Sequence, residues 1–368
     1  TDGLYMAEDD DGESYYYRGA VKNNYVSFAG FIWRIIRRNG DGSVRMIYSG
    51  KSTSDTGDNV TIGDSQFNSK DCDPTYVGYK YNEDFSLHEN NGTTGYSWFT
   101  NTQKYNFGTG YTFDETTKKF TLTGDIKQLT WNDNHDEIVN NQLYSCLGIS
   151  CNVVYKVTGY TNTTTMRVQP ISYSSKSLLT AQTNTTDSTI KTKLDNWYKT
   201  NMTSYSDKLV DETFCSDRSI TNGSGYLTTP STAYGAYTRL QNSKKPSLKC
   251  SQNNDKFKMS NESAKLDYPV GLILADEVAL AGGRAYYNGE YSPNSNYYLY
   301  NGKYYWTLSP SIFGSDYSFA NVWLVVPSGS LLPWSFLSNS IAVRPVINLK
   351  ADTLITKGDG TALNPFKI

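Results

Sequence analysis

The sequence predicts an α+β fold with few helices and many short antiparallel strands. Three observations lead to this class: a strand-turn-strand pattern within residues 1–50, one clear amphipathic helix near Asp187, and a final third in which short apolar runs alternate with turn residues. We expect residues 1–50 and 186–368 to form one discontinuous domain, and residues 51–185 to form a β-rich insertion or subdomain.

The first hairpin is predicted by apolar runs on either side of a turn. Residues 25–36 and 44–48 are rich in aromatic and β-branched side chains, and Asn39-Gly40-Asp41-Gly42 between them is typical of a tight turn. Trp33 lies within the first run and is expected in the core. The acidic run 8–11 lacks the ligand spacing of a calcium loop, so we interpret it as a solvated turn.

Residues 51–185 differ in character from the segments on either side. They are rich in Thr, Asn, Gly and Tyr and show little helical periodicity. Short strands are expected at residues 119–123, 152–158 and 165–169, separated by turn residues. This pattern predicts that the insertion is mainly β.

The clearest helix in the sequence begins near Asp187. Its apolar positions follow helical spacing and predict core packing: Ile190, Leu194 and Trp197. Asp187 or Ser188 can cap the first turn. Lys191 and Lys193 are expected to face water.

A second helix and several short strands are expected towards the C-terminus. The helix is predicted at residues 276–281, ended by Gly282-Gly283 and preceded by a strand at 270–274. Further strands are predicted at residues 297–300, 303–307, 319–326 and 342–349. Alternation along the third of these places Ala320, Val322 and Leu324 on one face and Asn321, Trp323 and Val325 on the other.

Composition argues against several classes of partner. The 34 Lys and Arg residues nearly balance 36 Asp and Glu, so the net charge of −2 predicts no attraction to nucleic acid. No apolar run is long enough to predict a transmembrane segment. The 31 Tyr and 7 Trp residues, with only 19% charged residues, are typical of extracellular β-rich proteins that bind through Tyr-rich surfaces.

The cysteines predict structural or free thiols and no metal site. There are five, at Cys72, Cys146, Cys151, Cys215 and Cys250. In an oxidising compartment Cys146 could pair with Cys151 and Cys215 with Cys250, which leaves one thiol free. His88 and His135 are the only histidines, and no zinc-type spacing occurs, so no metal or cofactor is expected.

The C-terminal stretch between residues 306–310 and 343–349 carries the strongest functional signal. Bulky aromatic side chains occur there among Ser, Gly, Asn and Asp, a mixture typical of recognition surfaces. The alternative is a loop-rich β edge whose rings fold inward. We expect Trp306 in the core, and Trp323 and Trp334 outward.

Arg344 has two interpretations. It could contact a carboxylate on a ligand, or it could be a buried framework residue that pairs with Asp276 or Glu277. The second interpretation is favoured because Arg344 lies beside Pro345 in an apolar strand.

Several blocks of this sequence resemble one family of bacterial surface proteins. They lie at residues 15–19, 25–36, 187–198, 214–219, 246–250, 268–273, 275–278, 306–310, 343–350 and 358–361. Together they resemble a domain of unknown function, numbered 6273, in surface proteins of gut Firmicutes and Mollicutes. That family is similar to the C-type lectin fold, in the branch of the formylglycine-generating enzymes and of the variable proteins of diversity-generating retroelements. The resemblance covers about 15–50 and 186–368.

The resemblance implies a C-type-lectin-like domain that is secreted or displayed on a bacterial cell surface. In retroelement-diversified proteins a Trp-x-x-Ser-type strand opens a variable region and an Arg-Pro-Val segment closes it. The matching framework positions are Trp306, Ser309, Ala320, Gly329, Arg344, Pro345 and Val346. The positions that match the diversified ones are predicted to bind the ligand: Ser311, Ile312, Phe313, Asp316, Tyr317, Phe319, Asn321, Trp323, Leu331, Leu332, Trp334, Phe336 and Asn339. The expected partner is a protein or a surface glycan, which the chain binds without catalysing a reaction and without a cofactor.

Two other functions fit the sequence less well. A calcium-dependent glycan-binding lectin would need oxygen ligands, which Asp316, Asn321 and Asn339 could supply, but no Glu-Pro-Asn-like set occurs near the C-terminus. An enzyme of the formylglycine-generating branch would need a reactive cysteine pair in the C-terminal part, and no cysteine follows Cys250. We therefore expect a protein that is not an enzyme.

Overall fold

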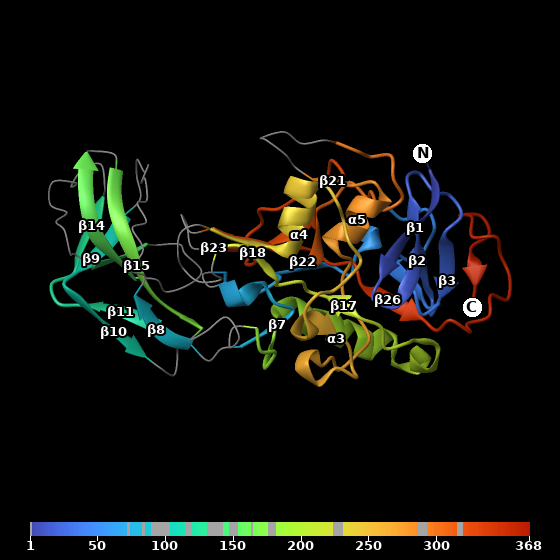
Figure 1. The fold of residues 1–368 in the computed structure, drawn as a ribbon, viewed down its shortest axis with the longest axis horizontal. Helices are drawn as coiled ribbons and strands as arrows, with labels where there is room; N and C mark the ends of the chain where they lie inside the picture. Colours follow the sequence, from blue (N-terminus) through green and yellow to red (C-terminus); the bar gives the residue numbers. More distant parts are fainter. Residues whose placement is uncertain are drawn as a thin grey trace.

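The fold is seen in a computed structural model of the chain. It describes residues 2–71, 74–82, 85–89, 104–114, 119–130, 143–146, 154–162, 165–175, 182–223, 231–285, 293–314 and 319–368. The described part is a mixed α+β structure that consists mostly of sheets with few helices, as predicted (Figure 1).

A seven-stranded sheet brings the two ends of the chain together. Its order is β1-β2-β4-β3-β27, and β5 joins β4 to β26. The strands are β1 (Gly3–Asp9), β2 (Gly12–Arg18), β3 (Tyr25–Phe28), β4 (Phe31–Arg38), β5 (Val44–Tyr48), β26 (Val346–Leu349) and β27 (Phe366–Lys367). The pairing of β4 with β5 confirms the predicted hairpin. Figure 1 shows the strands from both ends of the chain at one end of the molecule, where β27 pairs with β3.

An eight-stranded sheet carries the C-terminal segment. Its order is β18-β19-β22-β23-β24-β21, with β25 joining β22 to β6. The strands are β6 (Asp64–Ser65), β18 (Ile220–Asn222), β19 (Thr232–Tyr234), β21 (Arg284–Ala285), β22 (Tyr305–Gly314), β23 (Phe319–Val325), β24 (Ser330–Leu332) and β25 (Ile341–Ala342). A separate pair, β17 (Phe214–Cys215) and β20 (Lys256–Phe257), lies beside the sheets.

Three α-helices lie in the described part of the chain. They are α3 (Thr189–Asn201), α4 (Gly235–Tyr237) and α5 (Ala275–Ala281), and α4 continues into a π-helical turn at Thr238–Ser243. Short 3₁₀ turns occur at η1 (Gly57–Val60), η2 (Pro74–Val77), η4 (Thr203–Lys208), η6 (Asn253–Asp255) and η7 (Glu262–Ala264). The Ser188 side chain caps α3 by accepting from Lys191 N, and Gly282 ends α5, as the sequence predicted.

The insertion forms its own β structure. Six strands pair in the order β12-β9-β13-β14-β15-β8, and β10 pairs with β11. The strands are β8 (Phe85–Glu89), β9 (Lys104–Gly108), β10 (Gly110–Asp114), β11 (Lys119–Thr123), β12 (Lys127–Thr130), β13 (Leu143–Cys146), β14 (Val154–Asn162) and β15 (Thr165–Ser175). Figure 1 shows this sheet at the end of the molecule opposite β1 and β27.

The start of the insertion differs from the expected residue 51. Phe67, Tyr76 and Tyr79 are fully buried in the core of the body, and β6 pairs with β25 of the C-terminal segment. The composition of the sequence changes after residue 50, but composition alone does not show that these residues pack into the core of the body. The β-rich unit therefore begins after β7 (Lys80–Tyr81) and not at residue 51.

One arginine bonds to both segments that connect the insertion to the body, the one through which the chain enters it and the one through which the chain returns. β7 pairs with β16 (Thr186–Asp187) where the chain leaves and returns. The buried Arg218 guanidinium donates to Lys80 O at 3.1 Å and to Gln182 O at 3.2 Å, and Asp255 Oδ1 accepts from its Nε at 2.6 Å. Five donors in a fixed geometry allow one side chain to bridge these segments.

Trp33 and Trp306 are both fully buried, which confirms the two core assignments. Each indole N–H finds a backbone partner, Phe28 O at 3.1 Å for Trp33 and Ser65 O at 2.8 Å for Trp306. By contrast, residues 270–274 and 297–300 are both described by the structure and do not form the strands predicted there. Residues 270–274 instead run between layers, bonding to β26 through Gly271 and to Leu308 N through Ile273 O.

The turn between β3 and β4 offers a stabilising substitution. Ala29 has φ 54° and Gly30 has φ 79°, so both central residues of this two-residue turn are left-handed. This conformation is disfavoured for alanine and common for asparagine. We expect Ala29→Asn to raise the free energy of unfolding by about 0.5–1 kcal/mol, measured by urea denaturation. A less stable variant would show that the packing of the Ala29 methyl group contributes more to stability than the left-handed backbone conformation costs.

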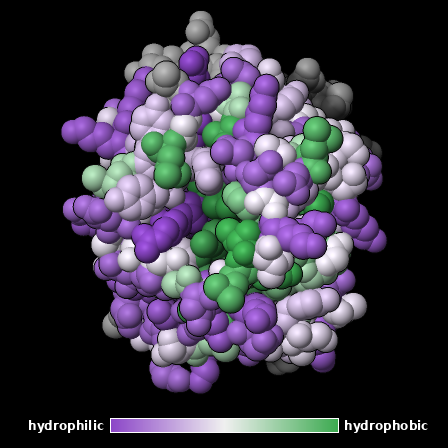
Figure 2. All heavy atoms as spheres, turned by 90° about the vertical axis from the view of Figure 1, so that its right-hand side faces the viewer, coloured by the Kyte–Doolittle hydropathy of each residue, from purple (hydrophilic) through white to green (hydrophobic). Residues whose placement is uncertain are grey.

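The end of the molecule around β1 and β27 carries exposed apolar side chains. Figure 2 shows hydrophobic side chains gathered in the middle of this face within a polar surround. Leu354, Ile355 and Leu363 belong to the C-terminal loops and are all exposed. None of the helices in the described part of the chain has the length and apolar character that a membrane crossing requires.

Candidate ligand-binding surface

Residues 333–339, here called the outer segment, follow β24 and lie against β23. A bridge joins Asn321 to Phe336, and Asn68 N donates to Leu337 O at 3.1 Å. Ser338 is held at both its side chain and its carbonyl: Ser338 Oγ donates to Asp71 Oδ2 at 2.6 Å, and Gln66 Nε2 donates to Ser338 O at 2.9 Å. The backbone of the outer segment is therefore fixed by the body of the domain.

Two aromatic rings of the outer segment face solvent. Trp334 is 46% exposed and Phe336 is 44% exposed, whereas the alternate residues Ser335 and Leu337 are buried. Such two-residue alternation is expected of an extended segment with one face on the core. Asn339 is also exposed, and its amide lies 3.4 Å from Ser335 Oγ. These side chains confirm the outward orientation predicted for Trp334.

Two further predicted ligand-binding residues are partly accessible. Ile312 on β22 and Leu332 at the end of β24 are both half-buried. Asp316 and Tyr317 lie outside the described residues, and so does the side chain of Phe319, at the start of β23.

Five of the predicted ligand-binding residues lie in the core, so their assignment to the surface was wrong. They are Ser311, Phe313, Asn321, Trp323 and Leu331, all of them buried. The expected alternation along β23 fails because both faces of this strand are covered. The Tyr237 ring of α4 lies 6.2 Å from the Trp323 ring, while η2 also packs against β23.

Arg344 is buried, as predicted, but its predicted partners were wrong. Its guanidinium donates to Tyr48 O at 3.1 Å and to Leu299 O at 3.1 Å, and lies 5.0 Å from the Tyr305 ring centroid. Burial lowers the pKa of Arg344.

The two acids on α5 have other partners. Arg239 binds Asp276 through Nε at 2.8 Å. Glu277 Oε1 lies 3.0 Å from Arg37 Nε and 2.8 Å from Arg45 Nε. The sequence holds a signal for these pairs, since charged residues recur inside the apolar hairpin strands and directly after the apolar run 270–274.

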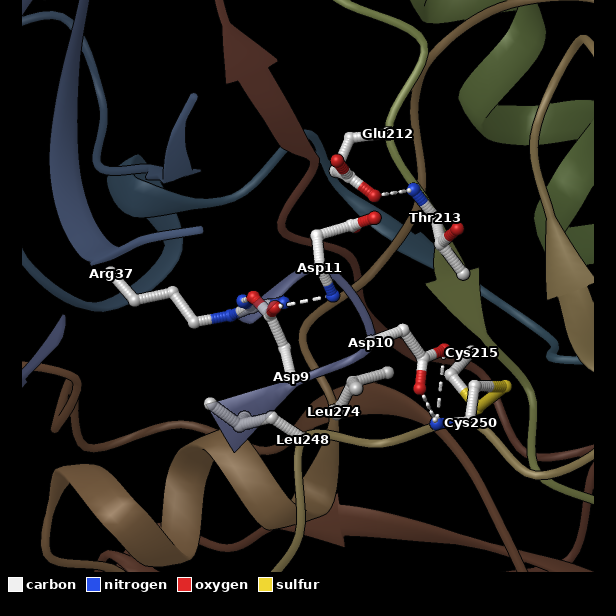
Figure 3. A pocket seen from close by; sticks show the side chains of 10 residues that line it. All are labelled: Asp9, Asp10, Asp11, Arg37, Glu212, Thr213, Cys215, Leu248, Cys250 and Leu274. Atoms are coloured by element: carbon white, nitrogen blue, oxygen red, sulfur yellow. Dashed lines mark hydrogen bonds and ion pairs between the residues drawn. A yellow bond between two sulfur atoms is a disulfide. The ribbon is translucent and has the colours of Figure 1, made fainter. Parts of the chain in front are cut away.

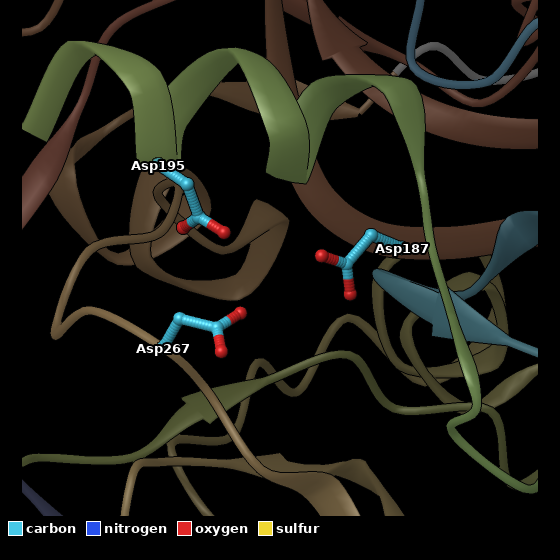
Figure 4. Close-up of side chains that lie close together, drawn as sticks. All are labelled: Asp187, Asp195 and Asp267. Atoms are coloured by element: carbon cyan, nitrogen blue, oxygen red, sulfur yellow. The ribbon is translucent and has the colours of Figure 1, made fainter. Parts of the chain in front are cut away.

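One cluster of carboxylates within the described residues has the proximity of a metal site. Asp187, Asp195 and Asp267 lie close together, as Figure 4 shows. The Lys191 ammonium occupies their centre, at 3.0 Å from Asp187, 2.5 Å from Asp195 and 2.7 Å from Asp267. The prediction that Lys191 faces water was wrong, because its side chain is fully buried. The Lys191 ammonium is therefore the cation that these three carboxylates bind.

The calcium interpretation gains no support from the predicted ligands. Asn321 is buried and its amide Nδ2 lies 3.5 Å from Ile312 O, whereas Asn339 is exposed on the outer segment. Asp316, the third predicted ligand, lies outside the described residues.

A second group of carboxylates lines a small hollow beside a disulfide (Figure 3). The bond joins Cys215 to Cys250, as predicted, while the second predicted pair, Cys146 and Cys151, and the remaining cysteine, Cys72, fall where side chains are not described. The hollow is lined by Asp9, Asp10, Asp11, Arg37, Glu212, Thr213, Cys215, Leu248, Cys250 and Leu274. Sequence analysis missed Glu212, which is isolated in the chain and reaches this group only through folding.

The comparisons with known proteins give no match: no family model, no curated protein and no solved structure is significantly similar to this chain.

Proposed function

We propose that this chain is a non-catalytic recognition protein that binds a protein or a surface glycan through the outer segment and the residues beside it. The proposal includes the finer expectations from the sequence: a C-type-lectin-like domain, displayed outside the cell, whose C-terminal face is varied by a diversity-generating retroelement. The ligand-binding set is narrowed to the accessible positions Ile312, Leu332, Trp334, Phe336 and Asn339, with Asp316, Tyr317 and Phe319 retained from the sequence.

The observation that carries this proposal is the contrast within the outer segment. Trp334 and Phe336 expose almost half of their large side chains, while the backbone directly after them is bonded to the body, Leu337 O by Asn68 N and Ser338 O by Gln66 Nε2. Rigid aromatic side chains lose little entropy on binding, which makes them effective anchors.

The chemistry of the surface supports binding more than catalysis. Besides the two rings, the outer segment consists of Pro333, Ser335, Leu337, Ser338 and Asn339, so it carries no acidic or basic side chain of its own. A partner would cover the two rings and exchange hydrogen bonds with Asn339 at the rim.

The diversification can be tested by sequencing the coding region for residues 305–345 from many cells of one population. We expect amino-acid changes to concentrate at Ile312, Asp316, Tyr317, Leu332, Trp334, Phe336 and Asn339. The matched internal control is the buried set at Ser311, Phe313, Asn321, Trp323 and Leu331, which should stay constant. A neighbouring reverse transcriptase gene with a near-copy of this region, differing at adenines, is expected as well.

Changes spread evenly over buried and exposed codons would contradict selective diversification. A constant sequence throughout would contradict diversification and would mean that the binding surface is fixed. Binding through this surface is tested separately by the double variant Trp334→Ser/Phe336→Ser. On glycan and protein arrays this variant is expected to lose at least tenfold in affinity for any ligand of the wild type, with an unchanged melting temperature. Undiminished binding by the double variant would refute a role for these rings.

A further inference from the structure

The seven-stranded sheet has one open edge, at β1. This strand is the last in the order β1-β2-β4-β3-β27, and β2 is its only partner strand in the described part of the chain. The opposite edge is covered, since Lys367 of β27 forms a bridge with Lys357. An uncovered edge offers backbone donors and acceptors to another strand.

The register of the β1–β2 hairpin decides which backbone groups of β1 point outward. Asp9 pairs with Gly12 across a two-residue turn, and the closing pair of such a turn exchanges its backbone hydrogen bonds. Hydrogen-bonded pairs alternate along an antiparallel ladder, so the N–H and C=O groups of Leu4 and Met6 point away from β2. No backbone hydrogen bond from these two residues to a segment other than β2 occurs among the described residues. Their N–H and C=O groups are therefore available to a further strand.

The side chains along this open stretch are apolar. Leu4 is 57% exposed and Met6 is 54% exposed, and Tyr17 and Tyr15 lie opposite them on β2. They belong to the end of the molecule that faces the viewer in Figure 2. Edge strands are usually protected from pairing by charged side chains or proline, and residues 3–7 contain neither. This edge is therefore suited to pairing.

The far end of β1 is already covered. A parallel bridge joins Asp9 to Leu248, and Lys249 Nζ lies 2.8 Å from Glu8 Oε2. A further strand can therefore reach only the short, uncharged stretch before Glu8. A strand that fits this stretch carries apolar side chains at two alternate positions and no charge between them.

We propose that the strand that pairs with this edge is β1 of a second copy of this chain, antiparallel and related by a twofold axis at Tyr5. Leu4 of each copy then lies opposite Met6 of the other, and their outward N–H and C=O groups bond to one another. A register shifted by two residues would place Leu4 opposite Glu8, where the segment at Leu248 covers the edge. The proposed register uses the free groups of both residues within the open stretch.

The charges near β1 favour a second copy over a basic partner strand. Antiparallel pairing places the acidic turns of the two copies at opposite ends of the shared ladder, so the neutral stretches meet without like-charge repulsion. Three acids of each turn already bind cations of their own chain, namely Glu8, Asp9 and Asp10. The turn therefore offers little charge to a basic strand.

The paired surface is small, so the dimer is expected to be weak. Each copy contributes two exposed apolar side chains and one strand edge, which is less than a standard interface and corresponds to a Kd of about 10–100 μM. The dimer carries two outer segments, so a ligand with repeated sites would be held by both. This last consequence rests on the proposed function, whereas the pairing of the strands does not.

Sedimentation velocity of the intact chain, without ligand and from about 1 to 500 μM, tests the pairing. We expect a monomer at the lowest concentration and a dimer at the highest. Leu4→Lys/Met6→Lys places like charges opposite each other and should remain a monomer throughout. Leu4→Lys/Met6→Glu places opposite charges there in the proposed register, so it should dimerise with a Kd within about tenfold of the wild type.

A proline variant tests the backbone contribution separately. Met6→Pro removes an N–H that points away from β2, so it keeps the hydrogen bonds of the hairpin and should remain a monomer with little change in melting temperature. Leu363→Lys is the matched control, because this leucine is fully exposed in a C-terminal loop, and it should dimerise as the wild type does. Trp334→Ser/Phe336→Ser should dimerise as well.

Several results would overturn the proposal. A monomer at every concentration would do so, and so would a dimer that persists in Leu4→Lys/Met6→Lys or in Met6→Pro. Equal loss of the dimer in the two charged double variants would contradict the register. Loss in Leu363→Lys or in the outer-segment variant would assign the contact to another surface. Because the dimer forms without ligand, this test can fail while the outer segment still binds, and the reverse.

Discussion

Replacing Lys191 by methionine is expected to lower the free energy of unfolding by about 3–5 kcal/mol at neutral pH. The substitution removes the one ammonium shared by Asp187, Asp195 and Asp267 and leaves three carboxylates facing one another. Lys193→Met, on the same helix and half-buried, is the control and should cost less than 1 kcal/mol. Urea denaturation of both variants measures the difference.

The loss in Lys191→Met should shrink as the pH falls. Burial raises the pKa of Asp195 to about 6, above the value of about 4 for an unfolded chain, even though Lys191 lowers it. A carboxyl group with a raised native pKa binds protons more tightly when folded, so falling pH between about 7 and 4 adds stability. Without the ammonium this effect is larger, and the variant should regain stability relative to the wild type. A deficit that is the same at pH 5 and pH 8 would contradict this account.

Replacing Trp323 by alanine is expected to cost about 3–5 kcal/mol of folding stability. The side chain is fully buried on β23, so its loss leaves a cavity next to Tyr237. This result would distinguish Trp323 from Trp334, which the sequence groups with it as outward.

A second substitution at the same position separates volume from hydrogen bonding. The indole Nε1 of Trp323 has no hydrogen-bond partner among the residues that the structure describes, so Trp323→Phe removes an unsatisfied donor together with part of the volume. We expect it to cost clearly less than Trp323→Ala, and Trp334→Ala to cost less than 1 kcal/mol. Equal losses for Trp323→Ala and Trp334→Ala in thermal unfolding would contradict the division between core and surface.

Local patterns predicted much of the fold. The hairpin from Tyr25 to Tyr48, the cap at Ser188 and the end of α5 at Gly282 depend on residues close in sequence, and all three are confirmed. The disulfide between Cys215 and Cys250 was one of the pairings that the sequence left open. The C-type-lectin-like assignment stays a prediction.

Interactions between distant segments could not be predicted in the same way. Helical spacing places Lys191 on a polar face, but Asp267 arrives from another part of the chain and, with Asp195, allows its burial. Trp323 has polar neighbours in sequence, yet helix α4 covers it. Trp334 and Phe336, in a segment with strict alternation, behave as their local pattern indicates.

The division of the C-terminal segment into a variable surface and a fixed core is tested most directly by the folded fraction of two display libraries. One library randomises Ile312, Leu332, Trp334, Phe336 and Asn339, and the other randomises Ser311, Phe313, Asn321, Trp323 and Leu331. Scored by protease resistance on the cell surface, most members of the first should fold and few of the second. Equal folded fractions, or a larger fraction in the second library, would contradict the account.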